Sequence, residues 1–320
     1  MVEIKINKSN ENQRLDKYLL KYFNKAPKSF IYKMLRKKNI KLNGKKAEGN
    51  EIIINNDIIN IYLSDETINS FREEKKLLKT NKDFKILFED KNLILCYKPI
   101  NLVCQPDINN KNNSLNDQLI FYMYKNGEYS LSSDFTPSIC NRLDRNTSGI
   151  VAFGKNLKTL QALNYAFKNG LIDKYYITAV YGNITKAGVI QLYHKKENNK
   201  AILSKTYIKD SKKIITKYTP IITKDNKTLL SIKLITGKTH QIRASLEYIG
   251  YPIIGDNKYN NNIKDISNFN LKNQFLHCYK IHFNKQLEYL DYLTNKTFIC
   301  KHMDKSFENV LRFFDYNIKE

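Results

Sequence analysis

The chain has 320 residues, which is long enough for two domains with a well-buried core, and its 54 Lys and Arg against 31 Asp and Glu leave a formal charge of +23. Such an excess favours a polyanionic partner, with nucleic acid first and an acidic membrane surface second. The apolar runs are only of strand length and no secretory signal is expected, so we expect no membrane anchor. Five scattered cysteines without a C-x-x-C pair and five histidines without an H-x-x-x-H pair argue against a disulfide framework and a metal site, and they favour a reducing cytoplasm.

Residues 12–63 are expected to form one compact unit with a basic face. The elements predicted in chain order are a helix over 14–23, a second helix from Pro27 to about Lys38, a strand over 40–42, a tight turn at Asn43-Gly44 and a strand over 58–63. Such a face suits contact with RNA phosphates, although a solvated lysine face with no partner is the alternative. The residues of this face that we single out for RNA binding are Lys33, Arg36, Lys37 and Lys38.

Residues 64–80 are highly charged and weakly periodic, so we interpret them as a linker. From residue 81 to 315, short strands separated by turn residues dominate, with three helices between them. The expected strands are 86–89, 93–98, 150–153, 174–181, 228–234 and 274–283, the expected helices are 115–124, 157–167 and 240–249, and Asn-rich loops are expected at 107–114 and 256–273. This pattern predicts a mixed α+β domain with a largely antiparallel β-sheet and flanking helices.

Residues 141–149, Asn-Arg-Leu-Asp-Arg-Asn-Thr-Ser-Gly, carry the strongest chemical signal. Asp144 lies between Arg142 and Arg145, on a segment that we expect to turn at Ser148-Gly149 before an apolar strand. A carboxylate so close to fixed positive charge stays ionised even when it is partly buried. On these nine residues alone, a structural ion pair and a catalytic group are both open.

Three further segments accompany this one. They are a strand-turn-strand that ends in Lys98-Pro99, the run Lys-Tyr-Tyr-Ile-Thr-Ala-Val-Tyr-Gly at 174–182, and the run Thr-Gly-Lys-Thr-His-Gln-Ile-Arg at 236–243. Together with Arg142-Leu143-Asp144-x-x-Thr147-Ser148-Gly149 they resemble the RluA family of pseudouridine synthases, over about residues 12–285. The order of elements in 12–63 resembles the S4 RNA-binding domain, which makes the chain similar to the RluC/RluD branch of that family.

The resemblance implies a pseudouridine synthase fold, with a small S4-like RNA-binding domain at 12–63 and the catalytic domain at 81–315. It also implies that specific uridines in RNA, in the large-subunit (23S) ribosomal RNA or its precursor, are isomerised to pseudouridine. That reaction breaks the C1′–N1 bond, turns the freed uracil and rejoins it through C5, and it needs no cofactor and no metal. The expected partner is therefore RNA, with no membrane, and we expect a monomer.

The resemblance assigns four site residues. Asp144 is the essential carboxylate, which either adds to the sugar as a nucleophile or takes the 2′ proton on a glycal-type route. Arg243 pairs with that aspartate, whereas a surface pair with Glu247 is the alternative. Tyr176 stacks on the target uracil, unless it is one more core aromatic, and Arg142 fills the gap that the flipped nucleotide leaves.

Two positions depart from the family's pattern. The family usually has His where this chain has Asn141, and often Arg where it has Lys238. The arginine-to-lysine change keeps the charge and loses bidentate geometry. Lys98 is expected to be a loop lysine near the RNA backbone. Two rival functions stay open: a ribosome-assembly RNA-binding protein without catalysis, and the same chemistry on transfer RNA.

Overall fold

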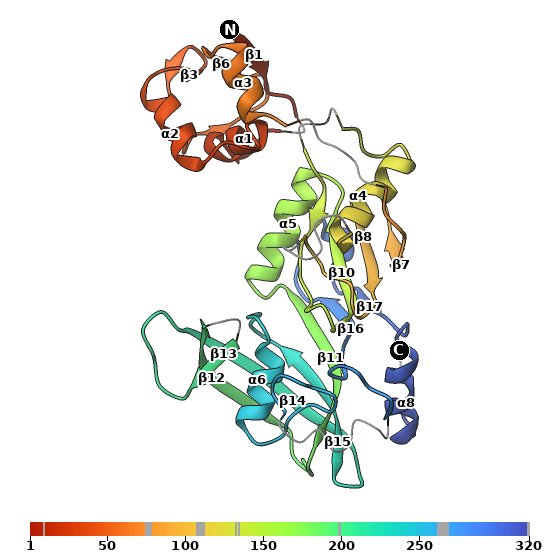
Figure 1. Cartoon of the computed structure of the whole chain (residues 1–320). Helices are drawn as coiled ribbons and strands as arrows, with labels where there is room; N and C mark the ends of the chain where they lie inside the picture. The colour runs from red at the N-terminus through yellow and green to blue at the C-terminus, as the bar shows by residue number, and fades with distance from the viewer. Residues whose placement is uncertain are drawn as a thin grey trace. The chain divides into compact units, whose positions relative to one another are not determined.

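The fold is described from a computed structural model, for residues 1–8, 10–73, 79–106, 113–131, 133, 135–197, 200–260 and 269–318. The chain folds into two compact units (Figure 1). The N-terminal unit comprises Met1–Lys79 with Ile120–Pro137, and the C-terminal unit comprises Thr80–Leu119 with Ser138–Glu320.

The N-terminal unit is built from short helices and short antiparallel strands. Its elements are β1 (Val2–Lys5), β2 (Gln13–Arg14), α1 (Leu15–Tyr22), α2 (Lys28–Arg36), β3 (Ile40–Leu42), β4 (Lys45–Lys46), β5 (Ile52–Ile53), β6 (Ile58–Ile61) and α3 (Asp65–Phe71). The four strands β1-β6-β3-β4 form one sheet, and β2 pairs with β5. The predicted helices and strands of this region are confirmed to within about two residues. Leu15 and Leu19 of α1 and Ile31 and Leu35 of α2 are buried in one apolar core, which explains the helical spacing.

The segment 64–80, which the sequence analysis interpreted as a linker, begins with a helix that was not predicted. Residues 65–71 form α3, whose start is capped by Ser64, because its side chain accepts a hydrogen bond from the Thr67 amide. Ile68 is buried in the same core as α1 and α2. The two apolar residues of this helix, Ile68 and Phe71, were too weak a periodic signal in a charged run. Residues 74–78 lie outside the described part of the chain.

The C-terminal unit is a mixed, largely antiparallel sheet with flanking helices, which confirms the predicted fold class. In the described residues the sheet has 11 strands, and its main path runs β13-β12-β14-β15-β11-β16-β10-β8-β7. Within this sheet, β10 and β16 pair in parallel and the other paired strands are antiparallel. The strands are β7 (Lys85–Glu89), β8 (Leu93–Lys98), β9 (Ser138–Ile139), β10 (Ser148–Gly154), β11 (Ile172–Tyr181), β12 (Gly188–Glu197), β13 (Lys200–Ser204), β14 (Lys212–Lys224), β15 (Lys227–Leu234), β16 (Leu276–Phe283) and β17 (Thr297–Ile299).

Helices cover this sheet in several places. They are α4 (Leu115–Lys125), which begins in this unit, α5 (Leu157–Lys168), α6 (Gln241–Tyr248), α8 (Lys305–Phe313) and the short η2 (Asp291–Leu293). Helix α5 packs against β10, and α6 packs against β12, β13 and β14 (Figure 1). Helix α8 shares an apolar core with β11 and β15 through Phe307, Ile177 and Leu229. Among the described residues, none of the helices has the length and apolar character that crossing a bilayer requires.

The prediction missed a large part of the sheet, the strands β12, β13 and β14. These strands contain several lysines and are only half buried, so buried apolar side chains such as Ile190, Leu192 and Ile214 are interspersed with exposed or partly exposed ones. This mixture is typical of a strand with one solvated face, but in so basic a chain it resembles a charged loop. Helix α8 was also missed, although Phe307, Val310 and Leu311 lie on one face at helical spacing.

Candidate active site

Asp144 lies on the loop that joins β9 to β10. The Thr147 amide donates to the Asp144 carbonyl at 3.0 Å, which closes a tight turn through Arg145 and Asn146. The turn expected at Ser148-Gly149 is therefore two residues too late, because β10 already begins at Ser148. The loop leaves the Asp144 side chain 28% exposed. The carboxylate can thus reach a ligand without first leaving a buried site.

Backbone contacts hold both sides of this loop. The Asn141 side chain donates to the Ile150 carbonyl at 3.2 Å and accepts from the Ala152 amide at 2.8 Å. The Leu143 amide donates to the Cys104 sulfur at 3.2 Å. Asn141 is thus engaged by β10.

Lys98 stabilises the loop through hydrogen bonds to backbone carbonyls. Its ammonium is fully buried and donates to the carbonyls of Pro99 and Leu102 at 2.7 Å and of Arg145 at 3.0 Å. Burial lowers the pKa of Lys98 to about 8. The expectation that Lys98 is a loop lysine near the RNA backbone is wrong, because the residue ends β8 and its three donors are occupied inside the protein.

Gly149 lets β10 approach β16 closely. Its φ is +124°, and a Cβ atom there would lie 2.3 Å from the Cys278 carbonyl oxygen. Another residue type would therefore push apart the two strands that form the parallel pair. Gly149 is therefore a requirement of strand packing.

The segment before α6 is held by Gln241. Its side chain donates to the Ile215 carbonyl and the Thr216 hydroxyl, and it accepts from the Thr236 hydroxyl and the Lys238 amide. The side chain of this buried residue therefore fixes the Thr-Gly-Lys-Thr-His turn against β14. The next residue back, His240, adopts a left-handed conformation with φ 56° at the start of α6.

Arg243, in the first turn of α6, links two carboxylates. Its Nε and Nη2 donate to the two oxygens of Asp256 at 2.7 and 2.8 Å, while its Nη1 lies 3.5 Å from Asp144 Oδ2. The side chain is only 8% exposed, so it lies inside the site and not on the surface beside Glu247. The geometry brings the predicted pair Asp144 and Arg243 together.

Asp256 is the stronger partner of that arginine. Its side chain is fully buried, and one oxygen also accepts from the Lys258 and Tyr259 amides at 2.9 and 3.0 Å. Burial alone would raise the pKa of Asp256, but the hydrogen bonds and charge of Arg243 and the two amides lower it overall. Asp256 therefore stays ionised and fixes the plane of the guanidinium.

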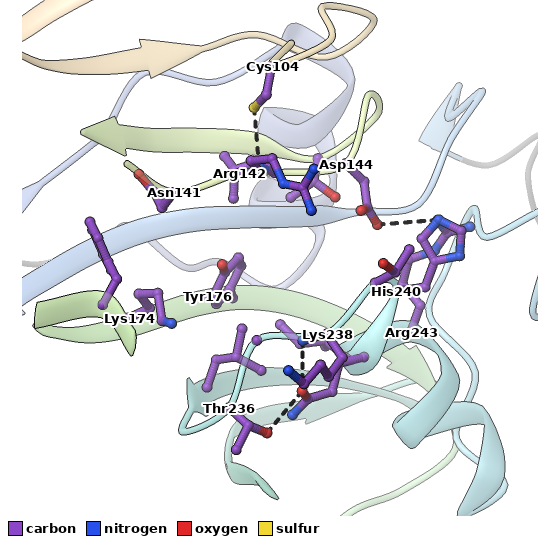
Figure 2. Close-up of a pocket in the computed structure, with 18 of the residues that line it drawn as sticks. Cys104, Asn141, Arg142, Asp144, Lys174, Tyr176, Thr236, Lys238, His240 and Arg243 are labelled. Atoms are coloured by element: carbon purple, nitrogen blue, oxygen red, sulfur yellow. Dashed lines mark hydrogen bonds and ion pairs between the residues drawn. The ribbon is translucent and has the colours of Figure 1, made fainter. Parts of the chain in front are cut away.

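His240 completes the polar side of the site. Figure 2 shows its ring facing Asp144, with Nε2 3.9 Å from Asp144 Oδ2, while its Nδ1 lies 3.1 Å from the Tyr259 hydroxyl. Burial lowers the pKa of His240, so the neutral ring is favoured. A neutral imidazole beside an ionised carboxylate can donate a hydrogen bond without adding a second positive charge.

Tyr176 lies in β11, where the pairing with β16 changes register. Tyr175 pairs with Lys280 and Tyr176 with Cys278, so β16 has one extra residue at this point. Such bulges re-aim side chains, and the Tyr176 ring faces the same space as Asp144 (Figure 2). Its side chain is buried, and burial raises the pKa of its hydroxyl well above the usual value.

These side chains line one cleft of about 920 Å³ within the C-terminal unit. Apolar and aromatic residues such as Leu143, Tyr176 and Ile235 line part of it, and Arg142 is an exposed residue at its wall. The cleft also has lysines from several elements, which are Lys168, Lys174, Lys196, Lys212, Lys213 and Lys238. The cleft thus has an aromatic wall that can contact a flat uncharged group, and a carboxylate with a fixed counter-ion. The lysines around it give a positive potential that favours an anionic chain.

Comparisons with known proteins agree with this geometry. Residues 92–248 match the family described as RNA pseudouridylate synthase. The chain is 35% identical over 294 residues to an uncharacterised RNA pseudouridine synthase of Mycoplasma genitalium, which covers 88% of each chain. It is 30% identical to the ribosomal large subunit pseudouridine synthase C of Rickettsia felis, covering 84% of this chain and 88% of that one.

The chain belongs to the RluA family of RNA pseudouridine synthases. Among solved structures, the human RNA pseudouridylate synthase domain containing 4 superposes with a TM-score of 0.57 at 18% identity, over 73% of this chain and 94% of that one. This likeness shows that the C-terminal unit has the pseudouridine synthase fold. The family is one of isomerases that act on RNA.

The synthase site also contains residues that the sequence analysis missed. Asp256, His240 and Tyr259 surround Arg243, but none was assigned a role from the sequence. A signal for Asp256 existed, because this acidic residue follows the apolar pair Ile253-Ile254 and a glycine. Among the described residues, no cluster of three or more His, Cys, Asp or Glu side chains could hold a metal ion.

The predicted RNA-binding residues lie in the N-terminal unit. Lys33 and Arg36 are on α2, and Lys37 and Lys38 follow its last turn. All four are exposed, and we refer to them as the α2 basic face.

Proposed function

We propose that this synthase converts specific uridines of large-subunit ribosomal RNA to pseudouridine, with Asp144 as the essential carboxylate. One observation carries the proposal: a partly exposed carboxylate lies 3.5 Å from a buried guanidinium, at the edge of a cleft that has an aromatic wall. The isomerisation needs a carboxylate at the ribose and a pocket that keeps the detached uracil. It needs neither a redox carrier nor a metal, because one carbon–nitrogen bond is exchanged for one carbon–carbon bond with no net oxidation.

Asp144 acts at the ribose of the target nucleotide. It either adds to C1′ as N1 leaves, or removes the 2′ proton so that a glycal forms, and in both routes it must be ionised at the start. Arg243 supplies a positive charge 3.5 Å from this carboxylate.

Tyr176 and Arg142 act on the base and on the gap that it leaves. The ring of Tyr176 stacks on the uracil and retains it while it turns, and its position in the cleft wall, on β11 opposite the bulge in β16, supports this role. Arg142 is exposed beside the cleft, where a guanidinium plane can replace part of the stacking lost when the nucleotide is extruded.

The N-terminal unit adds a second RNA contact. We propose that residues 12–63 are an S4-like RNA-binding domain and that residues 81–315 form the catalytic domain. The exposed charges of the α2 basic face support this division of labour, because they suit the phosphates of a polyanion. The Rickettsia relatives, whose names refer to the large ribosomal subunit, support that RNA as the substrate.

The test is a comparison of wild type with Asp144→Asn. We expect the variant to form no pseudouridine in large-subunit ribosomal RNA from a strain lacking the gene, while it still binds that RNA. Full activity of the variant would exclude Asp144 as the essential group. Pseudouridine mapping in the same strain tests the substrate: lost sites in transfer RNA would redirect the proposal, and no lost site anywhere would favour an RNA-binding protein without catalysis.

A further inference from the structure

A second cavity, of about 560 Å³, adjoins the catalytic cleft in the C-terminal unit. Asp144, His240 and Arg243 line both spaces, so the two meet at the carboxylate. The volume lies within the range of small-ligand sites, which is about 300–1,000 Å³. The cavity is therefore large enough for one unit of an extended polymer.

All ten side chains that line this cavity are polar or charged. The catalytic cleft differs, because Leu143, Tyr176 and Ile235 give it an apolar wall. A flat base needs such a wall, whereas a sugar–phosphate needs cations and hydrogen-bonding groups. The two linings therefore suit different parts of a nucleotide: the catalytic cleft suits the base, and the second cavity suits the sugar–phosphate backbone.

The charge of the cavity favours an anion. Arg145, Lys200 and Lys258 contribute three cations besides Arg243, whose charge Asp256 balances, against the single carboxylate of Asp144 in the lining. Burial, together with the charges of Arg243 and Lys200, lowers the pKa of Lys258, which reflects this crowding of positive charge. A bound anion would relieve the repulsion.

An amide in the lining also points to a sugar. The Asn146 Nδ2 donates to the Asn273 Oδ1 at 2.6 Å, but the buried Asn146 Oδ1 has no hydrogen-bond partner in the part of the chain that the structure describes. A buried acceptor without a donor is costly. A ribose hydroxyl is a donor of suitable size, and it accompanies each phosphate of an RNA strand.

We propose that this cavity is the subsite for the ribose–phosphate that connects the target uridine to its neighbouring nucleotide. The inference rests on the proposed function, since it takes the target ribose to lie at Asp144, where the two cavities meet. Lys200 and Lys258 contact the phosphodiester, and Asn146 accepts from the neighbouring ribose hydroxyl. The subsite thereby anchors the strand on one side of the extruded base.

The test uses the full chain and an RNA hairpin excised around a uridine that the wild type modifies. Lys258→Gln and Lys200→Gln are each compared with Lys186→Gln, an exposed lysine that lines neither cavity. We expect each subsite variant to weaken binding of the hairpin about five- to tenfold and to flatten the slope of log affinity against log salt by about 0.7. The control should do neither.

Replacing one phosphodiester of the hairpin with an uncharged linkage shows which phosphate the subsite contacts. We expect a methylphosphonate on one side of the target uridine to weaken binding to wild type by a similar factor, and to cause no further loss in Lys258→Gln. Losses that multiply, or variants that bind like the control, would overturn the subsite. If the wild type modifies no RNA at all, the proposed function fails; if it does so and the lysine variants behave as the control, only the subsite fails.

Discussion

Replacing Asp256 with Asn tests which of the two aspartates holds Arg243. The carboxylate receives four donors, which are the Nε and Nη2 of Arg243 and the amides of Lys258 and Tyr259. An amide of the same size removes the charge and turns an NH₂ group toward some of these donors. Since the arginine is only 8% exposed, its charge would be left poorly compensated in the interior.

The expected cost is large. Breaking a buried ion pair by removing one partner costs about 3–5 kcal/mol, and we take about 3 kcal/mol because Asn keeps one acceptor. For a domain of this size, that loss corresponds to a fall in Tm of about 6–12 °C. Asp144→Asn is the matched control: its contact with Arg243 is long, at 3.5 Å, and 28% of its side chain is exposed, so we expect a change below about 1 kcal/mol.

Thermal unfolding and pseudouridine formation, measured on both variants, separate stability from catalysis. Asp144→Asn should keep its Tm and lose activity. Asp256→Asn should lose Tm and, because Arg243 is no longer fixed, should lose about tenfold to a hundredfold in kcat below its unfolding temperature. A wild-type Tm for Asp256→Asn would refute the reasoning that this carboxylate balances the buried arginine.

The pH dependence gives a second check on Asp256. Its folded-state pKa is lowered, so its contribution to stability is fully present above the unfolded-state pKa of about 3.9 and is lost as the pH falls through the lower folded value. The difference in unfolding free energy between wild type and Asp256→Asn should therefore be the same at pH 7 and pH 5. A difference that already shrinks at pH 5 would contradict the lowered pKa.

Three further predictions concern other parts of the chain. Lys98→Met should lower the unfolding free energy by about 3 kcal/mol, because three backbone carbonyls lose a charged donor, and an unchanged urea midpoint would contradict this. Burial lowers the pKa of His277 to about 4, whereas the ordinary value in the unfolded chain is about 6.5. As the pH falls from 6.5 to 4, the unfolded chain therefore binds a proton before the folded chain does, and the unfolding free energy of the wild type should fall by about 3 kcal/mol. His277→Gln should lack this part of the pH dependence when both proteins are unfolded in urea. Changing all four residues of the α2 basic face to Gln should flatten the salt dependence of RNA binding by up to about 3 in logarithmic slope, whereas a wild-type slope would remove this face from the RNA contact.

The sequence predicts those parts of the fold whose signal is local. Leu93–Lys98 is an apolar run, and the helix after His240 has its own periodicity, so both were found at their bounds or within two residues. The strands β12–β14 were missed because many of their side chains are solvated and several of these are lysines. Their pairing with one another, the pairing of β14 with β15, and packing against α6 distinguish them from a loop.

The same limit applies to the site. Asp144, Tyr176 and Arg243 lie in recognisable motifs, so a role could be predicted for each of them from the sequence. Their proximity in space depends on the parallel pairing of β10 with β16 and on the bulge in β16. Asp256 reaches Arg243 from the segment after α6, and Lys98 reaches the Asp144 loop from 47 residues away. Such contacts are set by the tertiary fold, and no local pattern in one sequence specifies them.

The unequal sharing of Arg243 has a consequence for catalysis. Asp256 takes the Nε and Nη2 edge at 2.7 and 2.8 Å, which is the length of strong charge-assisted hydrogen bonds. Asp144 is left with Nη1 at 3.5 Å, where the attraction persists without a fixed geometry. A bidentate pair with Asp144 would have stabilised the carboxylate so firmly that moving toward a ribose would break two strong bonds. By taking the stronger hydrogen bonds of the arginine, Asp256 leaves the Asp144 carboxylate free to act on a ligand.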